Sequence, residues 1–160
     1  GMRICQFGFT RDVADFPNPY DLFLPHNYPS NCVAYTGTHD NNTVRGWFEE
    51  LENKDKEMVM TYLGCHQKEV VWAMIRCIMA SHAQHVIFPM QDLLDLDAKA
   101  RMNTPSTCGS HNWSWRMEQE HECDASLAKL EKLITIYGRN GKLADEKELE
   151  HLLAQTGRPC

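Results

Sequence analysis

Residues 33–41 read Val33-Ala34-Tyr35-Thr36-Gly37-Thr38-His39-Asp40-Asn41, and this stretch decides how the chain folds. A short apolar run ends in a tight Thr-Gly-Thr turn, and an imidazole and a carboxylate follow side by side. The pattern predicts a buried strand over residues 32–36 with polar side chains at its carboxyl end. Enzymes built on parallel strands keep their catalytic groups at that end of the sheet. His39 and Asp40 are therefore the first candidates for chemistry.

Two more apolar runs predict neighbouring strands, one over residues 4–9 and the other over residues 85–90. A loop rich in proline and asparagine, residues 15–31, leads from the first strand to the second. It is too long and too rich in helix and strand breakers to be a simple connection, and such loops often line sites. The order strand, loop, strand, helices, strand favours parallel strands with crossover connections.

The helices are predicted from apolar residues at helical spacing. A helix capped by Asn42 or Thr43 is expected to bury Val44, Trp47, Phe48 and Leu51. A second helix, over residues 68–84, is expected to bury Val71, Met74, Ile75, Ile78 and His82. Near the end of the chain, a helical face comprises Leu127, Leu130, Ile134 and Tyr137. A last helix begins with the capping-box pair Asp145 and Glu148. Residues 54–57 are interpreted as a solvated helix face.

Composition and charge argue against several classes of protein. The chain has 160 residues, a formal net charge of −6 and no basic stripe, so neither nucleic acid nor a membrane surface is an expected partner. No apolar run approaches the roughly 20 residues of a membrane span. The seven cysteines are odd in number, irregularly spaced and without a CxxC pair. They favour reduced thiols in a cytoplasmic protein over a disulfide framework or a zinc ribbon.

Residues 33–41 and three other segments together resemble the 4-α-glucanotransferases, also called amylomaltases or disproportionating enzymes. The three segments are Leu24-Pro25-His26-Asn27-Tyr28-Pro29, Ala100-Arg101-Met102-Asn103-Thr104-Pro105 and Asn112-Trp113-Ser114-Trp115-Arg116. The resemblance implies an α/β fold in which residues 1–116 form the C-terminal part of a TIM (β/α)₈ barrel, about strands six to eight. Residues 117–160 would be the C-terminal helices of the same domain. A barrel needs about 250 residues, so the chain is expected to be incomplete as a barrel on its own.

The activity implied by the resemblance is transfer of an α-1,4-glucan segment to the 4-hydroxyl of an acceptor glucan, by a retaining mechanism. Such enzymes use two carboxyl groups about 5–5.5 Å apart. A third carboxylate helps to stabilise the transition state, and the resemblance assigns this catalytic role to Asp40. It makes the adjacent His39 a substrate-binding residue. On local chemistry alone, an alternative stays open: His39, Asp40 and Asn41 merely cap the following helix.

The same resemblance makes three more residues candidate substrate contacts. Asn103 would hydrogen-bond sugar hydroxyls, or it is a turn residue that caps its own backbone. Phe7 would wall the sugar pocket and Trp113 would offer a stacking platform, although residue type favours core packing for both. Arg101 is interpreted either as orienting a carboxylate or as a solvated charge.

Two catalytic motifs of the family, resembling Arg-Ile-Asp-His for the nucleophile and Glu-Asp-Leu-Gly for the acid/base, do not occur in these 160 residues. A single carboxylate has no partner to protonate the leaving oxygen, so we expect the chain alone to be inactive. It should need the upstream barrel portion, or self-association, to cover exposed strand edges. The alternative function is that of a truncated fragment acting only in glucan binding or self-association. The mechanism requires neither a metal nor an organic cofactor.

An acidic cluster follows the third predicted strand. Asp92, Asp95 and Asp97 would bind a cation or, as we prefer, mark the start of a helix. The family tends to show Leu-Gly-Leu-Gly where this chain has Leu-Asp-Leu-Asp at residues 94–97, so the local turn is not predicted. His111, His121 and Cys123 lack the spacing of metal ligands.

Overall fold

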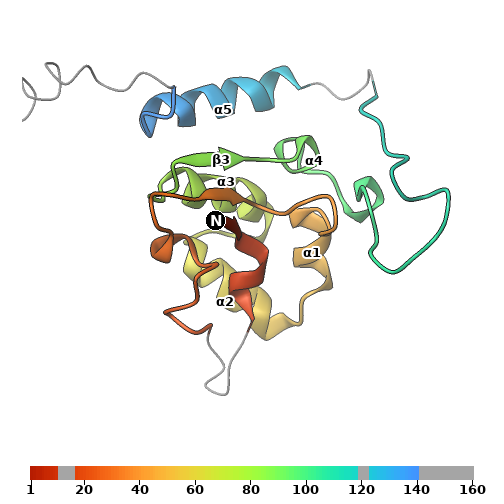
Figure 1. The fold of residues 1–160 in the computed structure, drawn as a ribbon, viewed down its shortest axis with the longest axis horizontal. Helices are drawn as coiled ribbons and strands as arrows, with labels where there is room; N and C mark the ends of the chain where they lie inside the picture. The colour runs from red at the N-terminus through yellow and green to blue at the C-terminus, as the bar shows by residue number, and fades with distance from the viewer. Residues whose placement is uncertain (11–16, 119–122, 141–160) are drawn as a thin grey trace, which may run out of the picture.

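The computed structural model describes residues 1–10, 17–118 and 123–140. A sheet of three parallel strands lies at its centre: β1 (Met2–Ile4), β2 (Val33–Tyr35) and β3 (His85–Ile87), in that order (Figure 1). The last residues of the three strands lie in register beside one another. The carboxyl ends therefore form one edge of the sheet, which confirms the predicted parallel α/β arrangement.

The first strand is shorter than predicted. It ends at Ile4, and Cys5–Phe9 forms a 3₁₀ helix (η1) in place of the expected strand over residues 4–9. Two hydrogen bonds hold this helix beside the end of β2: Gln6 N–H donates to Thr36 O at 3.4 Å, and Gln6 Nε2 donates to Asn42 O at 3.0 Å. The buried Gln6 side chain thus takes the place of further strand pairing.

The third strand also ends early, because Pro89 follows it. β3 stops at Ile87 and Pro89 caps α4 (Met90–Leu93), whereas a strand was predicted over residues 85–90. Proline has no N–H for the sheet ladder and fits the start of a helix.

Between β2 and β3 the chain forms three helices. In α1 (Val44–Glu50) the predicted cap is confirmed, since the Thr43 hydroxyl accepts a 3.0 Å hydrogen bond from Gly46 N–H. The second helix, α2 (Asn53–Leu63), contains the predicted solvated face at 54–57 and ends at Gly64, whose φ of 61° suits glycine. A short 3₁₀ helix, Gln67–Glu69 (η3), leads into α3 (Val70–Met79).

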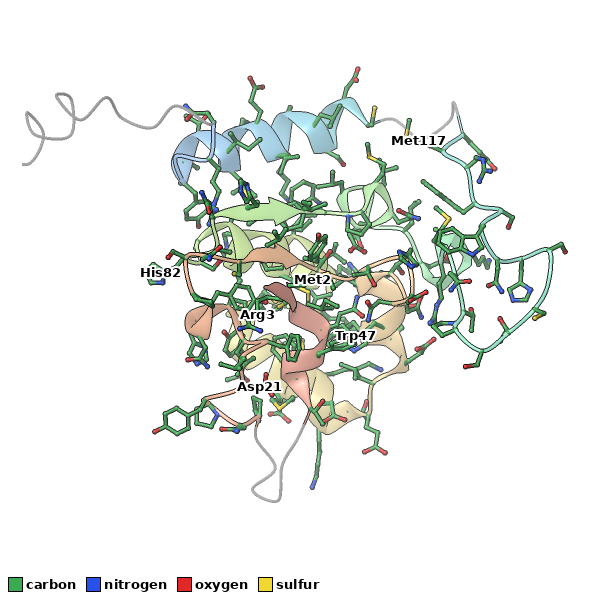
Figure 2. The ribbon with its side chains drawn as sticks, in the orientation of Figure 1. Met2, Arg3, Asp21, Trp47, His82 and Met117 are labelled. Atoms are coloured by element: carbon green, nitrogen blue, oxygen red, sulfur yellow. The ribbon has the colours of Figure 1, made fainter. Side chains whose placement is uncertain are left out.

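The prediction for α3 is right about its buried face and wrong about its end. The predicted side chains Val71, Met74, Ile75 and Ile78 are buried. The helix stops at Met79, so His82 lies beyond it, exposed at the periphery of the molecule (Figure 2). The Ser81 hydroxyl donates to Ile78 O at 2.7 Å, and this side-chain bond competes with continuation of the helix.

The last described helix, α5 (Asp124–Ile136), runs alongside β3 on the side away from β2 (Figure 1). Leu130, Ile134 and Tyr137 pack against the core as predicted, whereas Leu127 is 43% exposed. The predicted final helix at Asp145 and Glu148 lies outside the described residues. No helix in the described part of the chain is long and apolar enough to cross a membrane.

The two faces of the sheet differ sharply. One face packs on the helices, and the core there contains the fully buried side chains of Phe48, Leu24, Met74, Ile75, Ile78 and Val44. On the other face, Met2 is 56% and Ile87 50% exposed. These two residues and Tyr35 line an open hollow of about 840 Å³. Three strands therefore form an open sheet with one uncovered apolar face.

Candidate functional site

The turn after β2 presents the two leading candidates to solvent. The Asn41 side-chain oxygen accepts hydrogen bonds from Thr38 N–H and from the Thr38 hydroxyl, both at 2.9 Å. A Cβ at Gly37 would lie 2.8 Å from Gln6 Nε2, so a larger residue there would displace the side chain that donates to Asn42 O. The side chains of His39 and Asp40 are consequently 54% and 50% exposed, with His39 Nε2 lying 3.5 Å from Asp40 Oδ1. The capping alternative is not supported, since Thr43 is the residue that caps α1.

The segment after β3 brings Asn103 to the same place. Asn103 Nδ2 donates a 2.7 Å hydrogen bond to Asp40 Oδ1, and Asn103 N–H donates to His39 O at 3.1 Å. The predicted juxtaposition of the strand ends is therefore observed, and the amide contacts the carboxylate directly. The alternative in which the Asn103 side chain caps its own backbone does not account for this contact.

Of the two interpretations of Arg101, the solvated charge is wrong, and orientation of a carboxylate could act only through the backbone. Its guanidinium neither contacts a carboxylate nor stands free in solvent. Nη2 donates to the backbone carbonyl of Asp40 at 2.7 Å, and Nε donates to the backbone carbonyl of Asn103 at 2.9 Å.

The loop that follows carries Trp113 back to the site. Its ring lies against the His39 ring, with centroids 4.9 Å apart and the planes tilted by 41°. The Trp113 N–H donates to Met102 O at 2.7 Å, and its φ of 61° is uncommon for a bulky residue. Core packing is the wrong interpretation for Trp113, which is 54% exposed, whereas Trp115 is half-buried.

Phe7 lies on the rim of the open hollow. The 3₁₀ helix η1 turns its side chain outward, so that it is 48% exposed and meets Phe23 edge to face at 5.6 Å. The expected core packing is therefore incomplete. Phe7, His39 and Asp40 all line the hollow of about 840 Å³, a size within the range of ligand sites.

A buried carboxyl beneath the site was not predicted as a functional residue. Asp92 is only 2% exposed. Its Oδ2 accepts a 2.5 Å hydrogen bond from the Thr36 hydroxyl and its Oδ1 accepts a 2.8 Å bond from Val44 N–H. Burial raises the pKa of Asp92 to about 6, against the lowering effect of these two bonds. Asp92 thus joins the end of β2 to the start of α1.

The other two acids of the cluster have separate structural roles. Asp95 has a φ of 55°, where the family tends to show glycine, and pairs with Arg45 through two 2.9 Å contacts. Asp97 accepts from Lys99 N–H and caps the 3₁₀ helix Ala98–Ala100 (η4). Asp92 lies in the first turn of α4, as the helix-start interpretation predicted. Within the described residues, no group of three or more His, Cys, Asp or Glu could hold a metal ion.

One family of known proteins matches most of the chain. A family model for glycoside hydrolase family 77, described as 4-alpha-glucanotransferase, matches residues 1–121. The chain belongs to the 4-alpha-glucanotransferase family. This confirms the resemblance drawn from the four sequence segments.

Curated relatives show how much of a family member this chain represents. It is 48% identical over 141 residues to the 4-alpha-glucanotransferase of Clostridium butyricum, covering 87% of this chain and 28% of that protein. It is 41% identical over 143 residues to the chloroplastic/amyloplastic 4-alpha-glucanotransferase of Arabidopsis thaliana, covering 87% and 24%. The chain thus spans about a quarter of the length of these relatives.

A solved structure of the family superposes on the same region. The amylomaltase from Streptococcus agalactiae in complex with acarbose matches with a TM-score of 0.77 and 40% sequence identity. The match covers 86% of this chain and 27% of the amylomaltase. The three-stranded open sheet is therefore a partial copy of that fold.

Proposed function

We propose that this chain is the part of a retaining 4-α-glucanotransferase that supplies the transition-state-stabilising carboxylate, Asp40. The observation that carries the proposal is the 2.7 Å bond from Asn103 Nδ2 to Asp40 Oδ1, beside His39 and at the mouth of the hollow. The whole protein would transfer an α-1,4-glucan segment to the 4-hydroxyl of an acceptor glucan. It would do so through a covalent glucosyl intermediate.

The arrangement suits a neutral, polyhydroxylated ligand. Asn103 Nδ2 donates a hydrogen bond to Asp40 Oδ1, whereas among the described residues no group donates to Asp40 Oδ2. That oxygen is available to accept a bond from a sugar hydroxyl, and the negative charge favours an oxocarbenium-like transition state. With Nδ2 used on Asp40, Asn103 offers its Oδ1 as a second acceptor. His39 would add a polar contact to the same sugar.

The exposed rings extend the site. Phe7 lines the hollow and presents an apolar wall. Trp113 is half-exposed beside His39, where an aromatic face is accessible to a pyranose ring. We propose these as the substrate-binding aromatics of the chain.

The chemistry of glycosyl transfer needs two more carboxyl groups. Among the described residues, Asp40 is the single acidic residue that lines the hollow of about 840 Å³. We infer that a nucleophile and an acid/base residue come from an upstream portion of a longer protein, and that its strands close the (β/α)₈ barrel over the exposed face. The alternative is a non-catalytic fragment that binds glucan or self-associates, and the exposure of Met2 and Ile87 is equally compatible with it. A cytoplasmic location stays a prediction.

Two assays test the proposal. The 160-residue chain is incubated with maltotriose, and no glucose or longer oligomer is expected. Residues 1–118 then replace the corresponding segment of the Clostridium butyricum relative, and this chimera should convert maltotriose to glucose and longer oligomers. In the chimera, Asp40→Asn should abolish turnover, while Asp97→Asn, at the exposed cap of η4, should not. A folded chimera without activity, or an active Asp40→Asn variant, would refute the proposal.

A further inference from the structure

We propose that Arg101 is a positioning residue that fixes the Asp40–Asn103 pair. Its effect on glucan binding rests on the function proposed above, but its effect on the pair does not. Among the described residues, the guanidinium of Arg101 donates to backbone carbonyls of the site and not to its side chains. Its role would be exerted through the two residues whose backbone it holds.

The hydrogen bonds of Arg101 close a ring around the site. Nη2 donates to Asp40 O at 2.7 Å and Nε donates to Asn103 O at 2.9 Å. Asn103 Nδ2 in turn donates to Asp40 Oδ1 at 2.7 Å. The guanidinium is planar and directs its donors at fixed angles, so it sets the separation of the two carbonyls. Because both backbones are then fixed, the side chains meet in one geometry.

The backbone that carries Arg101 is itself firmly held. Arg101 N–H donates to Ala98 O at 3.1 Å, and Gln91 Nε2 donates to Ala100 O at 3.3 Å. Helix α1 packs closely on this segment, since a Cβ at Gly46 would lie 2.8 Å from Ala98 Cα. The ring therefore ties the turn after β2 to a fixed part of the scaffold. Lysine at position 101 could not reproduce it, because one ammonium on a flexible stem lacks the fork.

Arg139 provides a matched control. It also uses its guanidinium on backbone carbonyls, donating to Met79 O at 2.8 Å, Ser81 O at 2.6 Å and Ala83 O at 2.5 Å. These carbonyls precede β3, whereas Arg101 lies beyond its carboxyl end. Arg139→Lys should therefore lower the free energy of unfolding without altering the Asp40–Asn103 pair.

The test measures order at the pair by NMR on the whole chain. Order parameters are determined for the Asn103 side-chain NH₂ group in wild type and in Arg101→Lys, Arg101→Gln and Arg139→Lys. We expect this order parameter to be about 0.85 in wild type and in Arg139→Lys. It should fall below about 0.6 in both Arg101 variants. An Asn103 group that stays ordered in either folded Arg101 variant would overturn the proposal. A mobile Arg101 Nε–H in wild type would overturn it without any variant.

A second measurement separates this proposal from the proposed function. Acarbose is titrated into the same four proteins and followed through the amide signals of residues 37–41. If the affinity for acarbose falls about tenfold or more in the Arg101 variants and stays unchanged in Arg139→Lys, the positioning role is supported. Equal affinity in all four proteins counts against it. If wild type binds no acarbose while the order parameters change as expected, positioning is supported and the proposed function is not.

Discussion

Asn103 Nδ2 lies 2.7 Å from Asp40 Oδ1, although 63 residues separate the two along the chain. The contact exists because β2 and β3 are parallel neighbours in register, so that the segments leaving their carboxyl ends meet. The amide donor fixes the direction of this half-exposed carboxylate. The properties of the site follow from this pairing, and most of them can be tested by changing one partner.

Replacing Asn103 by aspartate should harm the site more than replacing it by alanine. Alanine only removes a donor, whereas aspartate places a second carboxylate beside Asp40, and two such groups cannot both ionise freely. We expect the free energy of unfolding of Asn103→Asp to be about 1 kcal/mol lower than that of Asn103→Ala at low salt, with the difference shrinking at about 1 M salt. Urea titration at the two salt concentrations measures this difference. A difference that is independent of salt would contradict the repulsion argument.

Because the backbone at Trp113 is left-handed, glycine should destabilise the protein less than alanine at this position. Both substitutions remove the ring that lies against His39, but only glycine adopts a φ of 61° without strain. Trp113→Gly should therefore be about 1 kcal/mol more stable than Trp113→Ala. Trp115, which has no positive φ, is the control position, and there the order should reverse. Thermal unfolding of the four variants gives the comparison.

The buried carboxyl of Asp92 should make stability depend on pH. Its pKa in the folded chain is about 6, above its ordinary value of 3.8, so the folded state holds the proton more tightly than the unfolded state. This contribution is fully present below about pH 4 and is lost as the pH rises through 6. Relative to Asp92→Asn, the wild type should lose roughly 2–3 kcal/mol between pH 4 and pH 7. Urea unfolding of both proteins across this range measures the loss.

Asp97→Asn serves as the control for that series, because Asp97 is an exposed cap and not a buried acid. Its stability should follow the wild type across the same range. If Asp92→Asn also followed the wild type at every pH, the carboxyl would not hold its proton in the folded state and the argument from burial would fail.

Removal of the Arg139 guanidinium should reduce the protection of α5 against hydrogen exchange more than that of other helices. Arg139 follows the end of that helix and bonds the carbonyls at the end of α3. Arg139→Ala leaves those partly buried carbonyls unpaired, at a penalty of about 1–3 kcal/mol. Amide hydrogen exchange in α5 should accelerate more than exchange in α1, to which Arg139 donates no hydrogen bond among the described residues. Equal acceleration in both helices would indicate global destabilisation instead.

Much of the fold could be predicted because its signals are local. The Thr43 cap, the buried face of α3 and the parallel order of the strands were all correct. The errors lie at element ends, where a local residue such as Pro89 or Ser81, or a contact distant in sequence, intervenes. Gln6 donates to the backbone beyond β2 and supports a 3₁₀ helix. At the end of α3, Arg139 donates to the carbonyl of Met79.

The candidate site divides in the same way. Gly37, His39 and Asp40 lie within one turn, so the sequence itself determined that an imidazole and a carboxylate would be presented at a strand end. Only the tertiary structure decided that Asn103 bonds that carboxylate, that Arg101 holds the backbone of both, and that Trp113 lies on His39. These contacts depend on the register of β2 against β3, which no short stretch of sequence encodes. They arise when burial of one face of the sheet on its helices brings the strand ends together.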